Sequence, residues 1–200
     1  MSTTDPFGLV GQALARKYLI EACVGEGGFA VVYRAKHLAF DRPVAVKCLK
    51  VPPHFTPEGQ RLFLERFREE GQRLFELSEH PSIVKVFDFD TTERNVPYLV
   101  LEWLEGKELA TELGERAQRG QGPYPEAEAL SLVRPAVEAL AHAHALGIAH
   151  RDVKPANLFL VRSARGLGLK VLDFGIAKAM QEGETATALV TKTSSGFQAF

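Results

Sequence analysis

The chain has 200 residues, 46% of them hydrophobic, a composition typical of a soluble globular protein with one sizeable domain or two small lobes. Its 24 lysines and arginines against 25 acidic residues leave no basic excess for nucleic acid or a membrane surface. No window approaches the roughly 18 apolar residues of a membrane span, there is no secretory pattern, and Cys23 and Cys48 lack metal-type spacing. We therefore expect a cytoplasmic protein with buried thiols.

The first half of the chain predicts a small sheet with one helix. Residues 1–17 are expected to be an N-terminal leader. Apolar residues recur at helical spacing between Pro57 and Leu77, and the segment Ser78-Glu79-His80-Pro81 ends this helix. Runs rich in β-branched and aromatic residues predict strands at 18–24, 31–37, 44–49, 83–89 and 98–101.

The second half is predicted to be mainly helical. It follows Glu105-Gly106-Lys107, which resembles a joint between lobes. The longest helix is expected at 125–146, with a kink at Pro135 and an end at Gly147. Its apolar face is predicted to consist of Leu130, Val133, Val137 and Leu140. Segments 158–161 and 169–172 predict a hairpin, and the Ser/Thr-rich tail from Gln181 predicts a loop.

Glycines lie between the first two predicted strands, in Gly25-Glu26-Gly27-Gly28-Phe29-Ala30. Such a stretch alone is weak evidence, because it could be a simple hairpin turn or could open a dinucleotide-binding fold. A dinucleotide site needs a helix after the glycines, whereas Val31-Val32-Tyr33-Arg34-Ala35 continues as a strand. The pattern favours a flap whose backbone amides approach phosphates.

A lysine and a carboxylate are candidate partners in the same half. Lys47 lies inside the apolar strand Val44-Ala45-Val46-Lys47, although a lysine at a strand end commonly just reaches water. Glu70 shares the buried stripe of the 57–77 helix, whereas Glu69 falls outside it. Glu70 is therefore the predicted partner of Lys47.

The densest chemistry is in His150-Arg151-Asp152-Val153-Lys154-Pro155-Ala156-Asn157 and in Asp173-Phe174-Gly175. Two acidic groups and an amide on neighbouring loops and strands can hold magnesium against a nucleotide and orient a hydroxyl for phosphoryl transfer.

These elements stand in the order of the eukaryotic-type protein kinases, and the chain resembles a bacterial serine/threonine protein kinase over residues 18–178. The resemblance implies an α+β, bilobal fold with an antiparallel-sheet N-lobe, one main helix and an incomplete, mainly helical C-lobe. It divides the chain into an N-lobe (18–101), a hinge (102–106), a partial C-lobe with the catalytic loop (107–180) and an activation-loop fragment (181–200).

The resemblance also implies roles for individual residues. Asp152 is the implied catalytic base, and Asn157 and Asp173 are implied ligands of Mg²⁺, with Mn²⁺ as a substitute. Lys47, paired with Glu70, would contact the α/β-phosphates. Lys154 would lie near the transferring phosphoryl group, which favours serine or threonine as the acceptor. By the same resemblance, His150 and Phe174 would be structural, stacking with Leu74.

The implied ATP site continues into the hinge. Glu102 to Leu104 would hydrogen-bond adenine through their backbone, behind Leu101. Its apolar walls would be Val32, Ala45 and Phe159, whose alternative role is ordinary core packing. The phosphate flap is implied to comprise Gly25, Glu26, Gly27, Gly28 and Ala30, with Ala30 in place of a third glycine.

The chain departs from the family where it stops at Phe200, before any Ala-Pro-Glu segment. We expect a fragment of a longer kinase, with the apolar face of the 125–146 helix short of partners. Arg151 beside Asp152 implies control by phosphorylation of the activation loop. The candidate acceptors are Thr185, Thr187, Thr191, Thr193, Ser194 and Ser195.

Three functions remain open from the sequence. The first is transfer of the ATP γ-phosphoryl group to protein serine or threonine, indicated by Lys47, Glu70, Asp152, Asn157 and Asp173. The second is a non-catalytic fragment that binds nucleotide or a partner. The third, a small-molecule kinase of the aminoglycoside-phosphotransferase type, is disfavoured by the Arg-Asp-x-Lys and Asp-Phe-Gly segments. The sequence does not specify an oligomeric state.

Overall fold

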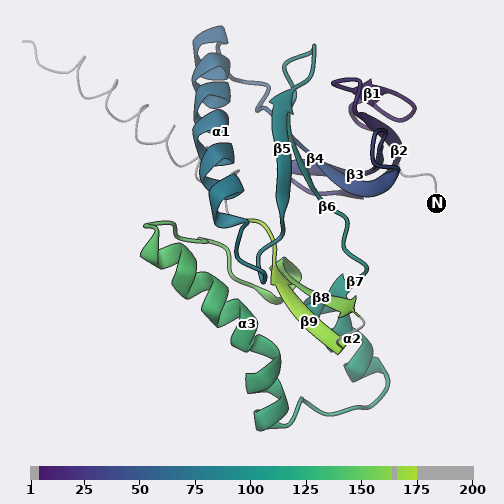
Figure 1. The fold of residues 1–200 in the computed structure, drawn as a ribbon, viewed down its shortest axis with the longest axis vertical. Coiled ribbons are helices and arrows are strands. Elements are labelled where there is room, and N and C mark those ends of the chain that lie inside the picture. Colours follow the sequence, from purple (N-terminus) through teal and green to yellow (C-terminus); the bar gives the residue numbers. More distant parts are fainter. Residues whose placement is uncertain (1–4, 164–165, 175–200) are drawn as a thin grey trace, which may run out of the picture.

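The computed structural model describes residues 5–163 and 166–174, which form two lobes (Figure 1). Gly175 and the predicted loop from Gln181, with its candidate phosphorylation sites, lie outside the described residues. The N-terminal lobe is an antiparallel sheet of six strands in the order β1-β2-β3-β4-β6-β5, with one helix, α1 (Pro57–Leu77). The strands are β1 (Ala13–Leu14), β2 (Tyr18–Glu26), β3 (Ala30–His37), β4 (Arg42–Leu49), β5 (Val86–Thr91) and β6 (Pro97–Glu102).

Apolar residues cover both faces of this sheet. The inner face packs against α1 through Phe63 and Phe67 of the helix and Leu99 of β6. The outer face carries Val31, Tyr33, Val46, Cys48 and Val100, together with Leu9 and Leu14 from the N-terminal segment. Both cysteines are buried thiols, as predicted, and burial raises the pKa of the Cys48 thiol to about 12.

Residues 5–14, which belong to the segment expected to be a leader, pack against this lobe. Asp5 accepts hydrogen bonds from the Tyr33 hydroxyl (2.8 Å) and from the Val10 backbone N–H (2.8 Å). Leu14 of β1 pairs with Tyr18 of β2. Residues 5–14 therefore close the outer face of the sheet.

Helix α1 has the bounds that its sequence pattern predicts. Thr56 is its N-cap, whose hydroxyl accepts the Gly59 N–H at 3.2 Å, and Pro57 starts the first turn. Gly71 is buried where the helix faces β5, and a Cβ there would lie 2.9 Å from the Phe89 ring. A glycine thus lets the helix approach the strand closely.

The C-terminal lobe combines helices with a three-stranded sheet ordered β7-β8-β9. Its elements are β7 (Gly106–Glu108), α2 (Leu109–Gln118), α3 (Glu126–Ala145), the 3₁₀ turn η1 (Pro155–Asn157), β8 (Leu158–Ser163) and β9 (Gly166–Val171). Gly106, in the predicted joint, has a φ of +153°, and a Cβ there would lie 1.9 Å from the Leu160 carbonyl oxygen. Only glycine fits where the chain enters this lobe.

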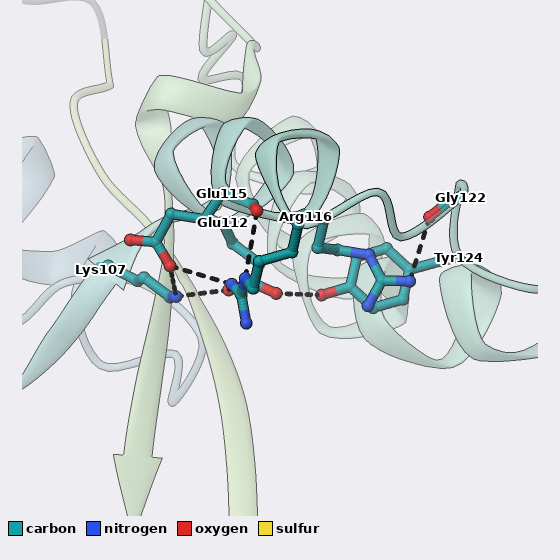
Figure 2. A network of polar contacts seen from close by, with 7 residues as sticks. Lys107, Glu112, Glu115, Arg116, Gly122 and Tyr124 are labelled. Atoms are coloured by element: carbon teal, nitrogen blue, oxygen red, sulfur yellow. Dashed lines mark hydrogen bonds and ion pairs between the residues drawn. The ribbon is translucent and has the colours of Figure 1, made fainter.

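Polar contacts join β7 to α2 (Figure 2). Lys107 pairs with Glu112 (2.5 Å) and Glu115 (2.7 Å) of the helix. The hydrogen bond from Lys107 lowers the pKa of Glu112 below its usual value. Arg116 lies over the Tyr124 ring, 3.9 Å from its centroid, and Tyr124 in turn donates to Glu112 at 3.2 Å. The network fixes α2 directly after the joint.

Helix α3 is buried through a face other than its predicted apolar stripe. The helix runs without interruption through Pro135, but the side chains it buries are those of Ala136, Ala139 and Ala143. Leu130 and Val137 of the predicted apolar face are 58% and 60% exposed, as expected for a face that is short of partners. Helix α3 packs against β9, and small alanine side chains allow the close approach that the larger residues would prevent.

One segment that precedes β5 connects the lobes. The strand predicted at 83–89 begins only at Val86, because Ile83 forms a parallel bridge with Val171 of β9. The Val171 N–H donates to the Ser82 main-chain carbonyl (2.7 Å), and the Val84 N–H donates to the Val171 carbonyl (3.0 Å). Leu74 of α1 packs on the cores of both lobes. These features confirm the predicted α+β, bilobal fold.

Candidate active site

The glycine loop is a tight turn at the edge of the N-terminal lobe. The Gly27 N–H donates to the Ala30 carbonyl at 2.8 Å, between β2 and β3. Lys50, directly after β4, holds this turn in place. Its backbone N–H donates to the Phe29 carbonyl, and its ammonium pairs with Glu26 at 2.7 Å. Ala30 lies in β3 and is buried, so its Cβ is accommodated by ordinary strand packing.

Packing inside the protein does not explain the glycines of this loop. A Cβ at Gly25 or Gly28 would meet nothing within 4 Å, and at Gly27 it would meet only the Ala30 carbonyl oxygen at 3.8 Å. Small residues therefore leave the inner surface of the turn open to a ligand that the backbone amides can approach.

Residues predicted to surround adenine lie on the inner face of the sheet. Val32 is opposite Lys47, and Ala45 is opposite Leu101, all of them half-buried. Phe159 lies in β8 of the other lobe and is also half-buried. Leu104 follows β6, and its backbone N–H donates to no acceptor among the described residues. Val32, Ala45 and Leu101 thus share one face of the sheet, and the Leu104 N–H is an available donor.

Lys47 bonds a different carboxylate from the one predicted. Its ammonium lies 2.5 Å from Asp173 Oδ1 across the two lobes. Glu70 instead pairs with Arg73 of its own helix at 3.0 Å. Among the described residues the predicted Lys47–Glu70 pair is therefore not formed, because α1 turns the Glu70 side chain along the helix surface. Glu70 remains half-buried, as its helical position predicts.

The loop after α3 gathers the predicted catalytic groups. Asn157 Nδ2 donates to the Asp152 carbonyl (2.8 Å) and to its carboxylate oxygen Oδ2 (3.0 Å). The Lys154 ammonium lies 2.7 Å from the same oxygen. Asn157 is buried in η1, whereas the Asp152 side chain is 40% exposed. The carboxylate is thus oriented by two donors while it still faces solvent.

His150 fixes this loop and does not act as a base. The Asp152 backbone N–H donates to His150 Nδ1 at 3.3 Å, so Nε2 carries the proton and donates to the Leu172 carbonyl at 2.7 Å. The ring is buried and stacks on Phe174 with centroids 4.7 Å apart. Both ring nitrogens are therefore committed to structure, which agrees with the sequence interpretation.

Two residues of the site have left-handed backbone conformations. Arg151 has a φ of +62° and Asp173 a φ of +52°. Such a conformation is costly for a side chain with a Cβ and is retained where the surroundings enforce it. The strained residues directly precede Asp152 and directly follow the Leu172 carbonyl that holds His150.

The predicted magnesium ligands offer a suitable donor set. Asn157 uses its amide nitrogen on Asp152, which leaves the amide oxygen as an acceptor. Asp173 is 44% exposed, and the Leu172 N–H bonds the Asn157 carbonyl (2.8 Å), which brings the two segments together. Mg²⁺ prefers such oxygens and takes one or two protein ligands together with substrate phosphates. Within the described ranges no group of three or more His, Cys, Asp or Glu side chains could hold a metal ion.

Sequence reasoning did not single out Lys170 or the side chain of Glu102. Lys170 of β9 forms an ion pair with Glu102 at the end of β6, and both side chains are largely buried. The two residues are 68 positions apart, so no local pattern joins them. The available sequence signal for this pair was a lysine within a predicted strand. In the structure Lys170 lies opposite Phe159, the predicted adenine wall.

The two-lobed fold with Lys47, the loop that carries Asp152 and the glycine turn agrees with what comparisons with known proteins find. The family model of the protein kinase domain matches residues 18–197, and the chain belongs to this family. Protein kinases are transferases that use ATP with divalent metal ions.

Similar proteins include bacterial serine/threonine kinases. The chain is 39% identical over 185 residues to a probable serine/threonine-protein kinase of Corynebacterium efficiens, covering 90% of this chain and 26% of that protein. It is 35% identical over 187 residues to the kinase PrkC of Bacillus subtilis, covering 94% and 26% respectively. The chain thus spans about a quarter of the length of these relatives.

A solved structure is also similar. The PknI kinase domain of Mycobacterium tuberculosis superimposes with a TM-score of 0.63 at 26% identity. The match covers 83% of this chain and 62% of that domain. In the part of the chain that the structure describes, no helix is long and apolar enough to cross a membrane.

Proposed function

We propose that the chain is the ATP-binding and catalytic part of a serine/threonine protein kinase, which transfers the γ-phosphoryl group of ATP to protein hydroxyls. The observation that carries this proposal is the Asp152 carboxylate, held by Asn157 and Lys154 and partly open to solvent. A carboxylate in this position can orient the acceptor hydroxyl and accept its proton. Lys154 beside it supports serine or threonine as the acceptor.

The other side of the proposed site binds the nucleotide. The turn formed by Gly25, Glu26, Gly27, Gly28 and Ala30 would cover the phosphates, because the glycines leave that surface open, although the Gly27 N–H is bonded to the Ala30 carbonyl inside the turn. Adenine would bind against Val32, Ala45, Leu101 and Phe159, with backbone contacts from Glu102 and Leu104. Bound Mg²⁺ would neutralise the phosphate charge, and Asn157 and Asp173 would hold it.

The contacts of Lys47 suggest that the described arrangement precedes transfer. Lys47 pairs with Asp173, so both groups must separate before one binds phosphate and the other metal. Glu70 pairs with Arg73, on a helix whose inward rotation would bring it toward Lys47. We therefore propose that α1 positioning controls activity, as it does in protein kinases generally.

The division of the chain into N-lobe, hinge, partial C-lobe and activation-loop fragment is part of this proposal. So are a cytoplasmic location, protein substrates, and phosphorylation within 185–195. The alternative is a fragment that binds nucleotide or a partner without turnover.

The test is transfer of labelled phosphate from Mg-ATP to a generic protein substrate, with nucleotide binding measured in parallel. Asp152→Asn is expected to reduce the rate by about 10²–10⁴-fold while nucleotide still binds. Asp41→Asn is the matched control, since the Asp41 side chain is 79% exposed on the β3–β4 turn and asparagine tolerates its φ of +54°. Equal rates in the chain and in Asp152→Asn would contradict the assigned base, and binding without transfer would favour the alternative.

A further inference from the structure

Three segments that are distant in the sequence meet at Lys170. Its ammonium pairs with Glu102 at the end of β6 and donates to the Ile83 carbonyl at 3.3 Å. The side chains of Lys170 and Glu102 are only 20% and 23% exposed. A largely buried ion pair is costly unless its geometry is well satisfied, so this contact constrains its surroundings more than a surface pair does.

Glu102 extends the pairing of β5 and β6 by one residue pair, to Lys85 just before β5, but with an unusual set of hydrogen bonds. Its backbone N–H donates to the Lys85 carbonyl at 2.9 Å, as in a regular hydrogen-bonded pair. The Lys85 N–H, however, donates to the Glu102 side-chain oxygen Oε1 at 2.7 Å instead of to the Glu102 main-chain carbonyl. The carboxylate therefore replaces the carbonyl in the ladder and releases that carbonyl from strand pairing.

Lys170 holds the carboxylate in this position, because it bonds the same oxygen, Oε1, that accepts the Lys85 N–H. Lys170 also lies directly opposite Phe159 in the β8–β9 pair. The lysine thus connects the strand pair that carries Phe159, a proposed wall of the adenine site, with Glu102, the first residue of the proposed hinge.

We propose that Lys170 is a positioning residue for adenine recognition. By keeping the Glu102 carboxylate in the ladder, it leaves the Glu102 main-chain carbonyl available to accept a hydrogen bond from the adenine 6-amino group. Without Lys170 the carboxylate turns to solvent, and the Lys85 N–H recaptures the carbonyl. This inference rests on the proposed nucleotide site, and it concerns which base that site accepts.

The test compares two nucleotides that differ only at the position concerned. ADP and purine riboside 5′-diphosphate, which lacks the 6-amino group, are titrated into the whole chain with Mg²⁺. The unaltered chain is expected to bind ADP about tenfold more tightly, since one buried hydrogen bond distinguishes the two. In Lys170→Met the expected ratio falls to about one, mainly through weaker ADP binding.

Two further variants separate positioning from general stability. Lys170→Arg keeps a cation beside Glu102 and is expected to retain most of the preference. Lys107→Met is the matched control, because it removes another half-buried lysine paired with carboxylates in the same lobe. It is expected to lower the melting temperature without changing the ratio of the two affinities. If Lys170→Met does not fold, Glu102→Ala decides, because it also frees the Lys85 N–H and should abolish the preference.

The outcomes are distinguishable. A preference retained in folded Lys170→Met or in Glu102→Ala overturns the inference about Lys170 and leaves the proposed function intact. Equal binding of both nucleotides by the unaltered chain also overturns only this inference. Failure of the unaltered chain to bind either nucleotide contradicts the proposed function itself.

Discussion

The two lobes differ in how completely their elements are covered. The six-stranded sheet has a packed core on each face, one beneath α1 and one beneath residues 5–14. In the C-terminal lobe, α3 and the β8–β9 hairpin share one core, while Leu130 and Val137 of α3 and Leu146 just after it are more than half exposed. Among the described residues, the N-terminal lobe is thus covered on both sides, whereas the C-terminal lobe that carries Asp152 is covered on one.

This difference teaches where sequence changes should matter. In the N-terminal lobe, residues of either face of the sheet contribute to a core. In the C-terminal lobe, among the residues described, substitutions on only one face of α3 should lower the unfolding free energy. Large effects are therefore expected at the joint between the lobes and on the alanine face of α3, and small effects at the edges of the N-terminal lobe.

The largest effect is expected for Gly106→Ala at the joint. The added Cβ would lie 1.9 Å from the Leu160 carbonyl oxygen, in backbone that disfavours any side chain. We expect a loss of about 3 kcal/mol or more in unfolding free energy, measured by urea denaturation. Gly114→Ala in α2, where a Cβ meets nothing within 4 Å, should instead stabilise by about 1 kcal/mol. Equal losses in both variants would contradict the steric explanation.

A second change tests the covered face of α3. Ala139 is fully buried, and Ala139→Leu should cost about 1–3 kcal/mol through overpacking. Val137→Ser, on the exposed face, should alter the unfolding free energy by no more than about 0.5 kcal/mol. Thermal and urea unfolding of the two variants measure the contrast, and a reversed order would contradict the one-sided packing of this lobe.

An intermediate effect is expected at the start of α1. Thr56→Ala removes the hydroxyl that caps the Gly59 N–H and should destabilise the chain by about 1 kcal/mol. Thr56→Ser keeps the hydroxyl and should recover most of that loss. If serine and alanine are equally destabilising, the capping bond is not the cause.

The smallest effect concerns the N-terminal cover of the sheet. Burial alone would raise the pKa of Asp5, but hydrogen bonds from the Val10 N–H and the Tyr33 hydroxyl outweigh it, and the pKa lies below 3.8. The stability that Asp5 contributes is therefore present above pH 3.8 and is lost as the pH falls through the lower, folded-state pKa. We expect under about 1 kcal/mol, because Asp5 is only half-buried and water screens its carboxylate. Urea midpoints measured from about pH 2 to about pH 6 should show this acid-dependent loss in the original chain and lack it in Asp5→Asn.

Local patterns in the sequence were sufficient for much of the fold. The apolar stripe between Pro57 and Leu77, with Phe63 and Phe67, predicts α1 with the bounds that the structure has. The exposed apolar face of α3 was expected, but its buried alanine face was not identified, because alanine contributes little to a hydrophobic pattern even where close packing requires it.

The candidate site, like the fold, could be predicted from the sequence only in part. The order of Lys47, Asp152, Asn157 and Asp173 predicts phosphoryl-transfer chemistry, but the partner of Lys47 depends on how the lobes and α1 are placed. Periodicity puts Glu70 on the inner side of α1, and it cannot show that Arg73 takes its carboxylate. The Lys170–Glu102 pair was missed for a related reason, since it joins residues from different lobes.

The bridge between Ile83 and Val171 has a consequence for folding. The segment that leads into β5 is hydrogen-bonded to a strand almost at the end of the described chain, so β5 gains its full set of contacts only after the β8–β9 hairpin has formed. Such a long-range contact slows folding, because a large loop must close first. It also couples the two lobes energetically, so they should unfold in one cooperative transition rather than one after the other.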